Sequence, residues 1–451
     1  MIATLISRKS GRALTAAFLV AGLLFGQPAV AQGLIRDAEI EATLKRVMAP
    51  VLKSAGMGSN SIQVLVVNDR TLNAFVINSR NIFVHSGLIT RMTTLDMLQS
   101  VMSHELAHIT SGHIIRRGIA QQSAASAAGL GLLLSLAVAA SGSPEAASGL
   151  AAGTSGAALR GFLSHTRAQE ITADKIGARY LARANINPAA ALNVLEIFRG
   201  QEVLSIGRQD PYTLTHPLSR QRIRALQGEV AAYGDRSTQT TKTLKYWHAR
   251  MVAKFNGFLG NPTASLRKVK NSDKSEAALL TRAIAYHRLA NRTKALANIN
   301  ALLARRPNDA YYHELKGQIL LESGQKSAAV ASYKRAVALA PKEPLIIAGY
   351  GRALLANNTK SGNRAALDVL KKARRMDARD ARMLRDLAVA YAKAGNNGMA
   401  SLVTAERYAL LVRFKDAQTH ASRAAGLLPR GSGGWLRAQD VLSAAKTALA
   451  K

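Results

Sequence analysis

A spacing of 34 residues in the second half of the chain constrains the fold more than any other feature. Three pairs of small or helix-ending residues show this interval: Pro307 and Pro341, Gly317 and Gly351, and Ala295 and Ala329. A unit of this length accommodates two antiparallel helices, with small residues where they cross. Because one unit cannot bury its apolar face alone, several must stack, and we predict an all-α solenoid over residues 271–451.

The clearest unit runs over residues 308–341, with Tyr333 and Ala336 where tetratricopeptide repeats carry an aromatic residue and an alanine. Flanking units are less regular: residues 274–307, 342–378 with a small insertion, and 379–429 in degenerate form. The second half therefore resembles tetratricopeptide repeats, whose stacks generally present a concave face to a ligand. A plain array of helical hairpins without a partner is the alternative.

A chain of 451 residues is too long for one ordinary core. Gly, Asp, Ser, Thr and Gln cluster at residues 233–241 and mark a boundary. We predict a first folded part at 32–235, a helical linker at 236–270 and the solenoid at 271–451. No residue pattern beyond the boundary suggests catalysis.

Residues 1–31 have the pattern of a secretory signal peptide. A basic segment at 8–12 precedes an uncharged run at 13–26, and the small residues 29–31 form a cleavage site before Gln32. A retained membrane anchor is the weaker alternative, because the apolar run is short for a span.

Cysteine is absent, so a metal in this protein would be held by histidine and carboxylate side chains. The net charge of +34 would suggest nucleic acid as a partner in the cytosol, but the signal segment directs the chain elsewhere, and no nucleic-acid partner is expected. The basic side chains suit contact with an anionic membrane surface or an acidic envelope polymer. The simpler alternative is that they solvate helix faces.

The first part is predicted to be α+β and mostly helical. Apolar residues recur at helical spacing in four segments, which are expected to be helices: residues 36–55, 94–115, 164–184 and 188–198. Three β-rich runs are expected to form a small β-meander: residues 62–67, 74–77 and 82–84. An almost uncharged stretch at 118–159 predicts a helical hairpin that packs on the protein or covers the active site, with membrane contact or a span as alternatives.

The central motif is His104-Glu105-Leu106-Ala107-His108 on the helix predicted at 94–115. Positions i and i+4 of a helix share one face, so both imidazoles can reach one zinc ion, with Glu105 beside them to take a proton from water. The composition predicts fewer than about 0.01 chance matches to this pattern, which favours a zinc hydrolase over a pair of unrelated histidines.

A zinc hydrolase needs a third protein ligand and one open position. A third histidine in the metzincin spacing would lie at position 114, which is Ile114, so that reading fails. His113 lies about 140° around the helix from His108, and we assign it a structural or supporting role. Glu170 and Asp174 are spaced i, i+4, so one could bind the metal while the other orients a ligand histidine.

Residues 164–177, with the pattern Glu170-x-x-Ala173-Asp174, resemble the signature of gluzincin peptidases of the HtpX and BepA type. The resemblance extends over essentially the whole mature chain. It implies a zincin-like domain followed by tetratricopeptide repeats, a periplasmic location, and one zinc ion per chain held by His104, His108 and Glu170, with Asp174 supporting a ligand.

The same resemblance covers residues 215–223, which contain His216-Pro217 and Arg222. It implies that His216 closes onto the zinc as a latch or acts as a donor in the transition state, and that Arg222 positions the loop or stabilises the oxyanion. An ordinary loop histidine before proline is the alternative for His216. An extended substrate is expected to pair with an edge strand, for which the sequence suggests Ile82, Phe83 and Val84.

These features predict a zinc metalloendopeptidase of the cell envelope that degrades unfolded or misassembled proteins. The resemblance implies that the repeats dock it to outer-membrane protein assembly machinery. The alternative is a chaperone or assembly adaptor whose peptidase site is mostly latched. A housekeeping peptidase for short peptides is less favoured, since it has little use for a repeat domain.

Overall fold

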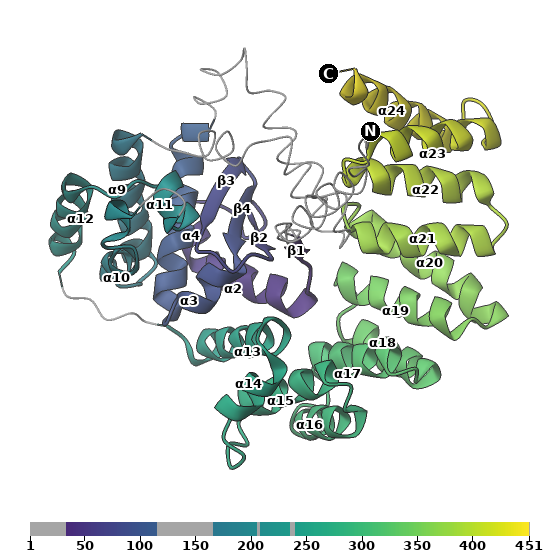
Figure 1. Ribbon diagram of the computed structural model, residues 1–451, viewed down its shortest axis with the longest axis horizontal. Helices are drawn as coiled ribbons and strands as arrows, with labels where there is room; N and C mark the ends of the chain where they lie inside the picture. The colour runs from purple at the N-terminus through teal and green to yellow at the C-terminus, as the bar shows by residue number, and fades with distance from the viewer. Residues whose placement is uncertain (1–32, 115–165, 205–207, 235–239, 451) are drawn as a thin grey trace, which may run out of the picture.

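The computed structural model describes residues 33–114, 166–204, 208–234 and 240–450 (Figure 1). The predicted signal segment and the predicted hairpin at 118–159 lie outside the described residues. Figure 1 shows a first part built on a small sheet, and an arc of antiparallel helices that begins beneath it and rises along one side. Among the described helices, none combines the length and apolar character that crossing a membrane requires.

The first part contains a four-stranded sheet with the order β1-β2-β4-β3. Its strands are β1 (Leu34–Ile35), β2 (Gln63–Val67), β3 (Ala74–Asn78) and β4 (Asn81–His85). β2 pairs with β4 in parallel, and β3 pairs with β4 antiparallel. The predicted fold class is confirmed, but the expected meander is wrong in its connections.

The turn chemistry explains the difference. Asn78 Oδ1 accepts hydrogen bonds from the backbone N–H groups of Arg80 and Asn81, at 2.8 and 2.9 Å, and so closes a tight β3–β4 hairpin. The longer connection at residues 68–73 carries the chain past β4, which leaves β3 at the edge. The segment Ile82–Val84 therefore lies in the centre of the sheet, and its predicted role as a substrate-pairing edge is wrong, because its backbone pairs on both sides.

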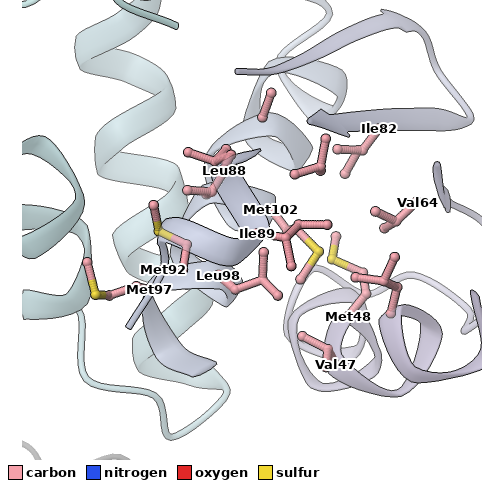
Figure 2. Packing of buried hydrophobic residues seen from close by; sticks show 14 of the residues in the cluster. Val47, Met48, Val64, Ile82, Leu88, Ile89, Met92, Met97, Leu98 and Met102 are labelled. Carbon is pink, nitrogen blue, oxygen red and sulfur yellow. The ribbon is translucent and has the colours of Figure 1, made fainter. Parts of the chain in front are cut away.

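Helices pack on this sheet and form the first part. They are α2 (Ala38–Ser54), α3 (Ser86–Arg91), α4 (Leu95–Thr110), α9 (Arg167–Arg183), α10 (Ala189–Ile197), α11 (Pro211–Thr215) and α12 (Arg220–Ala232), with a 3₁₀ turn at Gln201–Val203. Figure 2 shows the core between them: Met48 from α2, Ile82 from the sheet, Leu88 and Ile89 from α3, and Met102 from α4 are all buried together.

Helix α4 is buried along nearly its whole length, from Met97 to His108. Helix α9 passes close to α4 at Gly177, where a Cβ atom would lie 3.4 Å from the backbone of His104, in van der Waals contact. Ser103 Oγ also donates a hydrogen bond to the Gly177 carbonyl at 2.8 Å. The central helix is thus fixed against α9, which carries the predicted third metal ligand.

The second part is a stack of helical pairs. Its helices are α13 (Lys242–Leu259), α14 (Pro262–Lys268), α15 (Glu276–Arg288), α16 (Arg292–Arg305), α17 (Ala310–Glu322), α18 (Lys326–Leu339), α19 (Pro344–Asn357), α20 (Lys360–Met376), α21 (Ala381–Lys393), α22 (Asn397–Leu410), α23 (Phe414–Leu427) and α24 (Gly433–Leu449). The predicted solenoid is confirmed. The Tyr333 ring occupies the space that a Cβ atom on Gly317 would need, and the Leu370 side chain does the same for Gly351. This close packing explains why glycine recurs at the 34-residue interval.

The two parts share helix α13 and a set of buried ion pairs. Met251 of α13 belongs to the core of the first part, whereas Ala253 belongs to that of the repeats. On the same helix, Arg250 pairs with Glu39 of α2 and with Asp309, which precedes α17, each at 2.5 Å. A second link joins Arg36, which precedes α2, to Asp377, which follows α20, at 2.5 Å. The segment predicted as a linker therefore packs into both cores, while the domain limits stay a prediction.

Candidate metal centre

Three separate segments supply the predicted metal ligands. α4 carries His104 and His108 on one face, and α9 carries Glu170 in its first turn. A capping box between Thr166 and Gln169 fixes the start of α9, and so the position of Glu170. His216 follows α11. All four candidate ligand side chains are buried, and their donor atoms lie within 4.8 Å of one another.

The separations between these donor atoms fit a tetrahedral site. Ligands bound to zinc at about 2.0–2.1 Å in a tetrahedron lie roughly 3.3 Å from one another. The two Nε2 atoms of His104 and His108 are 3.1 Å apart, and His104 Nε2 lies 3.3 Å from His216 Nδ1. Glu170 Oε1 lies 3.3 Å from His108 Nε2 and 3.1 Å from His216 Nδ1. These residues therefore fit a zinc ion with three or four protein ligands.

Asp174 and Arg222 hold the ligands in place. His104 Nδ1 contacts Asp174 Oδ1 at 2.9 Å, which orients the ring so that Nε2 faces the other ligands. Arg222 donates to both oxygens of Asp174, at 2.6 and 3.0 Å, and reaches Glu170 Oε2 at 2.7 Å. It also donates to the His216 carbonyl at 3.1 Å. One buried guanidinium thus contacts α9 and the segment that carries His216, and acts on His104 of α4 through Asp174.

The electrostatics of the cluster favour a cation at its centre. Burial alone would lower the pKa of His104, but its hydrogen bonds to Asp174 and Glu170 outweigh this and raise the pKa to about 10. Burial lowers the pKa of His108 to about 3. Burial would raise the pKa of Glu170, but Arg222 above all holds it well below its usual range. The ionised carboxylates of Asp174 and Glu170 thus favour a positive charge at His104. A bound divalent ion would supply that charge.

Glu105 lies beside the candidate ligands, and its carboxylate is buried with few hydrogen bonds. Both of its carboxylate oxygens are buried and make no hydrogen bond of good geometry with the described residues, although His216 Nε2 lies 3.3 Å from Oε1. Burial raises the pKa of Glu105, despite the opposing effect of His216. A carboxylate with a raised pKa and free lone pairs is suited to accept and return a proton.

His113 contacts a candidate ligand, although the helical spacing predicted that it would point away from His108. α4 ends at Thr110, and Gly112 turns the chain back with a φ of +66°, so the expected 140° offset from His108 does not apply. His113 is buried, and its Nδ1 lies 2.9 Å from Nδ1 of His108. The assigned supporting role therefore agrees with the geometry, whereas the expected direction does not. A glycine shortly after the motif was the available signal.

The edge strand β3 lies beside the cluster. His85 N donates to Asn73 O at 2.9 Å, so by the alternation of an antiparallel pair Ala74 and Val76 turn their backbone groups away from β4. His216 Nε2 contacts the Ala74 carbonyl at 3.2 Å. The sequence analysis missed this edge because the order of strands in a sheet is not visible in their periodicity.

The fold and the site together define a metallopeptidase domain followed by tetratricopeptide-type repeats. Residues 35–230 match the model of peptidase family M48, so this part of the chain is similar to M48 metallopeptidase domains. The expected resemblance to gluzincin peptidases is confirmed.

Similarity to particular proteins extends over both parts. The chain is 26% identical over 404 residues to the Escherichia coli β-barrel assembly-enhancing protease, covering 88% of this chain and 81% of that protein. The mitochondrial metalloendopeptidase OMA1 of Schizosaccharomyces pombe is 28% identical over 195 residues, covering 41% of this chain and 51% of that protein. Among solved structures, a thermophilic TPR protein of Thermus thermophilus covers 39% of this chain and all of its own, with 20% identity and a TM-score of 0.28.

Proposed function

We propose that this chain is a periplasmic zinc-dependent endopeptidase in which His104, His108 and Glu170 hold one zinc ion. The set of donor separations near 3.3 Å carries the proposal, because two histidines and a carboxylate in a tetrahedral arrangement are typical of catalytic zinc. A bound zinc ion supplies Lewis acidity, which polarises the scissile carbonyl and makes a water molecule a stronger acid.

Glu105 then acts as the base that takes the proton of the attacking water and delivers it to the leaving amine. Its two oxygens without good hydrogen bonds and its raised pKa support this role. Arg222 acts through position: it holds Asp174, Glu170 and the carbonyl of His216 in one arrangement.

Substrate is proposed to bind as an extended strand along β3, not along the central strand β4. The outward backbone groups of Ala74 and Val76 offer hydrogen bonds to such a segment. Pairing of this kind recognises backbone and needs no chain end, which favours an endopeptidase acting on unfolded segments.

His216 is proposed to close the site in the state described. Its Nδ1 completes the group of four donors, and its Nε2 contacts the Ala74 carbonyl on the edge where substrate would pair. This contact supports the second candidate function, a chaperone or assembly adaptor with a latched site. In both cases His216 must leave before cleavage.

The relatives named for enhancing β-barrel assembly support an envelope role. We propose that unfolded or misassembled envelope proteins are the substrates, that the repeats dock the enzyme to outer-membrane assembly machinery, and that the basic surface permits contact with an anionic membrane. Nucleic acid is not among the proposed partners.

Degradation of a reduced, unfolded protein by the zinc-loaded enzyme tests the proposal. Glu105→Gln should keep its zinc and lose activity, and His216→Ala should cleave faster than the unchanged protein if the latch closes at rest. If neither the unchanged protein nor His216→Ala degrades the substrate with zinc bound, the endopeptidase is rejected and the adaptor is favoured. Equal rates with and without His216 would reject the latch.

A further inference from the structure

A cavity of about 440 Å³ lies where the first part meets the repeats, and it shares no residue with the metal centre. Arg46 of α2 and Trp247 of α13 form one wall. The turns that precede α17 and α19 form the rest, with Tyr311, Leu339 and Pro341 among the lining residues. A ligand bound here would touch both parts of the molecule.

Arg46 is the residue that points to a ligand. Its guanidinium lies over the Trp247 ring, 4.2 Å from the centroid, and its Nη1 atom is buried without a hydrogen-bond partner among the described residues. Tyr311 packs edge-on against the same ring at 5.7 Å. The Tyr311 side chain also hydrogen bonds with Arg46, but Nη1 has no acceptor, although buried arginine donors are normally satisfied.

The nearby charges do not supply that acceptor. Arg250 takes both Glu39 and Asp309, and among the described side chains no carboxylate comes within 4.0 Å of the Arg46 guanidinium. Glu343 lines the same cavity, and burial raises its pKa although Arg46 lowers it. Glu343 is therefore a competitor of an incoming anion.

The start of α19 adds to the preference for an anion. Glu343 is its N-cap residue, but the Glu343 side chain makes no capping hydrogen bond. The uncapped first turn of this 14-residue helix presents partial positive charge next to the cavity.

We propose that this cavity binds the terminal carboxylate of a polypeptide together with the apolar side chain next to it. The planar guanidinium of Arg46 matches a carboxylate, and the Trp247 ring with Leu339 and Pro341 accommodates an apolar group attached to the same carbon. A chain terminus presents both groups from one residue, which an internal acidic side chain does not.

Intrinsic fluorescence tests this proposal, because the chain has two tryptophans and Trp435→Phe leaves Trp247 as the only reporter. The probe is acetyl-Ala-Leu with a free carboxylate, added to the full chain carrying Glu105→Gln so that nothing is cleaved. We expect a saturable change in emission. The C-terminal amide of the same peptide should bind at least about tenfold more weakly.

Three variants sharpen the test. Arg46→Gln should weaken binding at least about tenfold, and Arg46→Lys should lose part of it. Glu343→Gln, which removes the competitor and leaves Arg46 in place, should tighten binding. Arg288→Gln, exposed on α15 outside the cavity, is the control and should change nothing.

The outcomes are distinct. Equal binding of acid and amide, or unchanged affinity in both Arg46→Gln and Glu343→Gln, would overturn the proposal. Equal binding of an amidated peptide with an internal glutamate would overturn the assignment to a chain terminus. If Arg46→Gln fails to fold, as circular dichroism would show, Glu343→Gln alone decides. Because binding is measured in Glu105→Gln, the result does not depend on the proposed peptidase activity.

Discussion

Two buried arginines in this molecule each pair with two carboxylates, but they serve different parts of the structure. In the metal centre, Arg222 lies between Asp174 and Glu170, and at the junction of the two parts Arg250 lies between Glu39 and Asp309. Arg222 of α12 holds two carboxylates of the single helix α9, whereas Arg250 joins carboxylates from segments far apart in the chain. The first arrangement orients the proposed metal ligands, whereas the second holds the repeats against the first part. A buried ion pair therefore does not reveal its function, which depends on what its carboxylates touch next.

Replacing Arg222 by leucine is expected to have the largest effect. The change leaves Asp174 and Glu170 buried without the guanidinium that balances their charge, and breaking a buried ion pair destabilises a fold by about 3–5 kcal/mol. Zinc affinity should also fall roughly 10–100-fold, because Asp174 no longer orients His104 firmly. Urea unfolding and competition with a chelator measure the two losses.

Arg220→Gln is the matched control, since Arg220 is exposed at the start of the same helix. Arg222→Lys keeps the charge but cannot donate to both carboxylate oxygens of Asp174 at once. Its zinc affinity and stability should lie between those of Arg222→Leu and Arg220→Gln. Normal zinc affinity in folded Arg222→Leu would show that Arg222 has no part in the metal centre.

Arg250→Leu should destabilise the fold by about 3 kcal/mol and leave zinc affinity unchanged, because Glu39 and Asp309 contact no metal ligand. The free energy of unfolding and the zinc content of the folded fraction are the measurements. Lys245→Gln, exposed on the same helix, should be neutral. Loss of zinc from folded Arg250→Leu would contradict the separation of the two networks.

His113→Ala removes the partner of His108 Nδ1 and should lower zinc affinity by about tenfold, with a smaller effect on stability than either arginine change. His113→Asn can still hydrogen bond and should recover part of the affinity. If alanine and asparagine bind zinc as tightly as histidine, the contact has no influence on the metal.

The junction should also show a pH dependence. Burial raises the pKa of Glu314 to about 7, although Lys254 opposes this. The unfolded chain releases that proton near pH 4.3, so stability present below this pH is lost as the pH rises toward 7. Glu314→Gln should flatten this slope and stabilise the protein at pH 8 by on the order of 1 kcal/mol. Asp440→Asn, exposed on α24, should leave the slope unchanged. An unchanged slope in Glu314→Gln would show that folding does not shift the pKa of Glu314, and a change of slope in the opposite sense would show that folding lowers it.

Residues within one element were predictable from the sequence, and residues joined across elements were not. His104 and His108 share one helix, so their spacing alone indicated a common ligand. Glu170 and His216 were assigned only through a family resemblance, because periodicity says which face of an element is buried and not what lies against it. The same limit hid the position of β4 in the sheet and the meeting of Arg46 with Trp247.

His113 shows a further limit. A helical wheel assumes that the helix continues, and a single left-handed glycine at position 112 invalidated it. The repeats were predicted better, because each 34-residue unit packs mainly on its neighbours and so carries its tertiary contacts within a short stretch of sequence.

Helix α13 has a consequence for how the chain folds as it is made. Met251 and Phe255 complete the core of the first part, yet they lie after every residue proposed to touch the metal. A newly made chain that has emerged only as far as the ligands still exposes apolar side chains on α2 and α3 that wait for α13. The proposed metal centre should therefore reach its final form only after α13 has been made, when the first repeats begin to emerge.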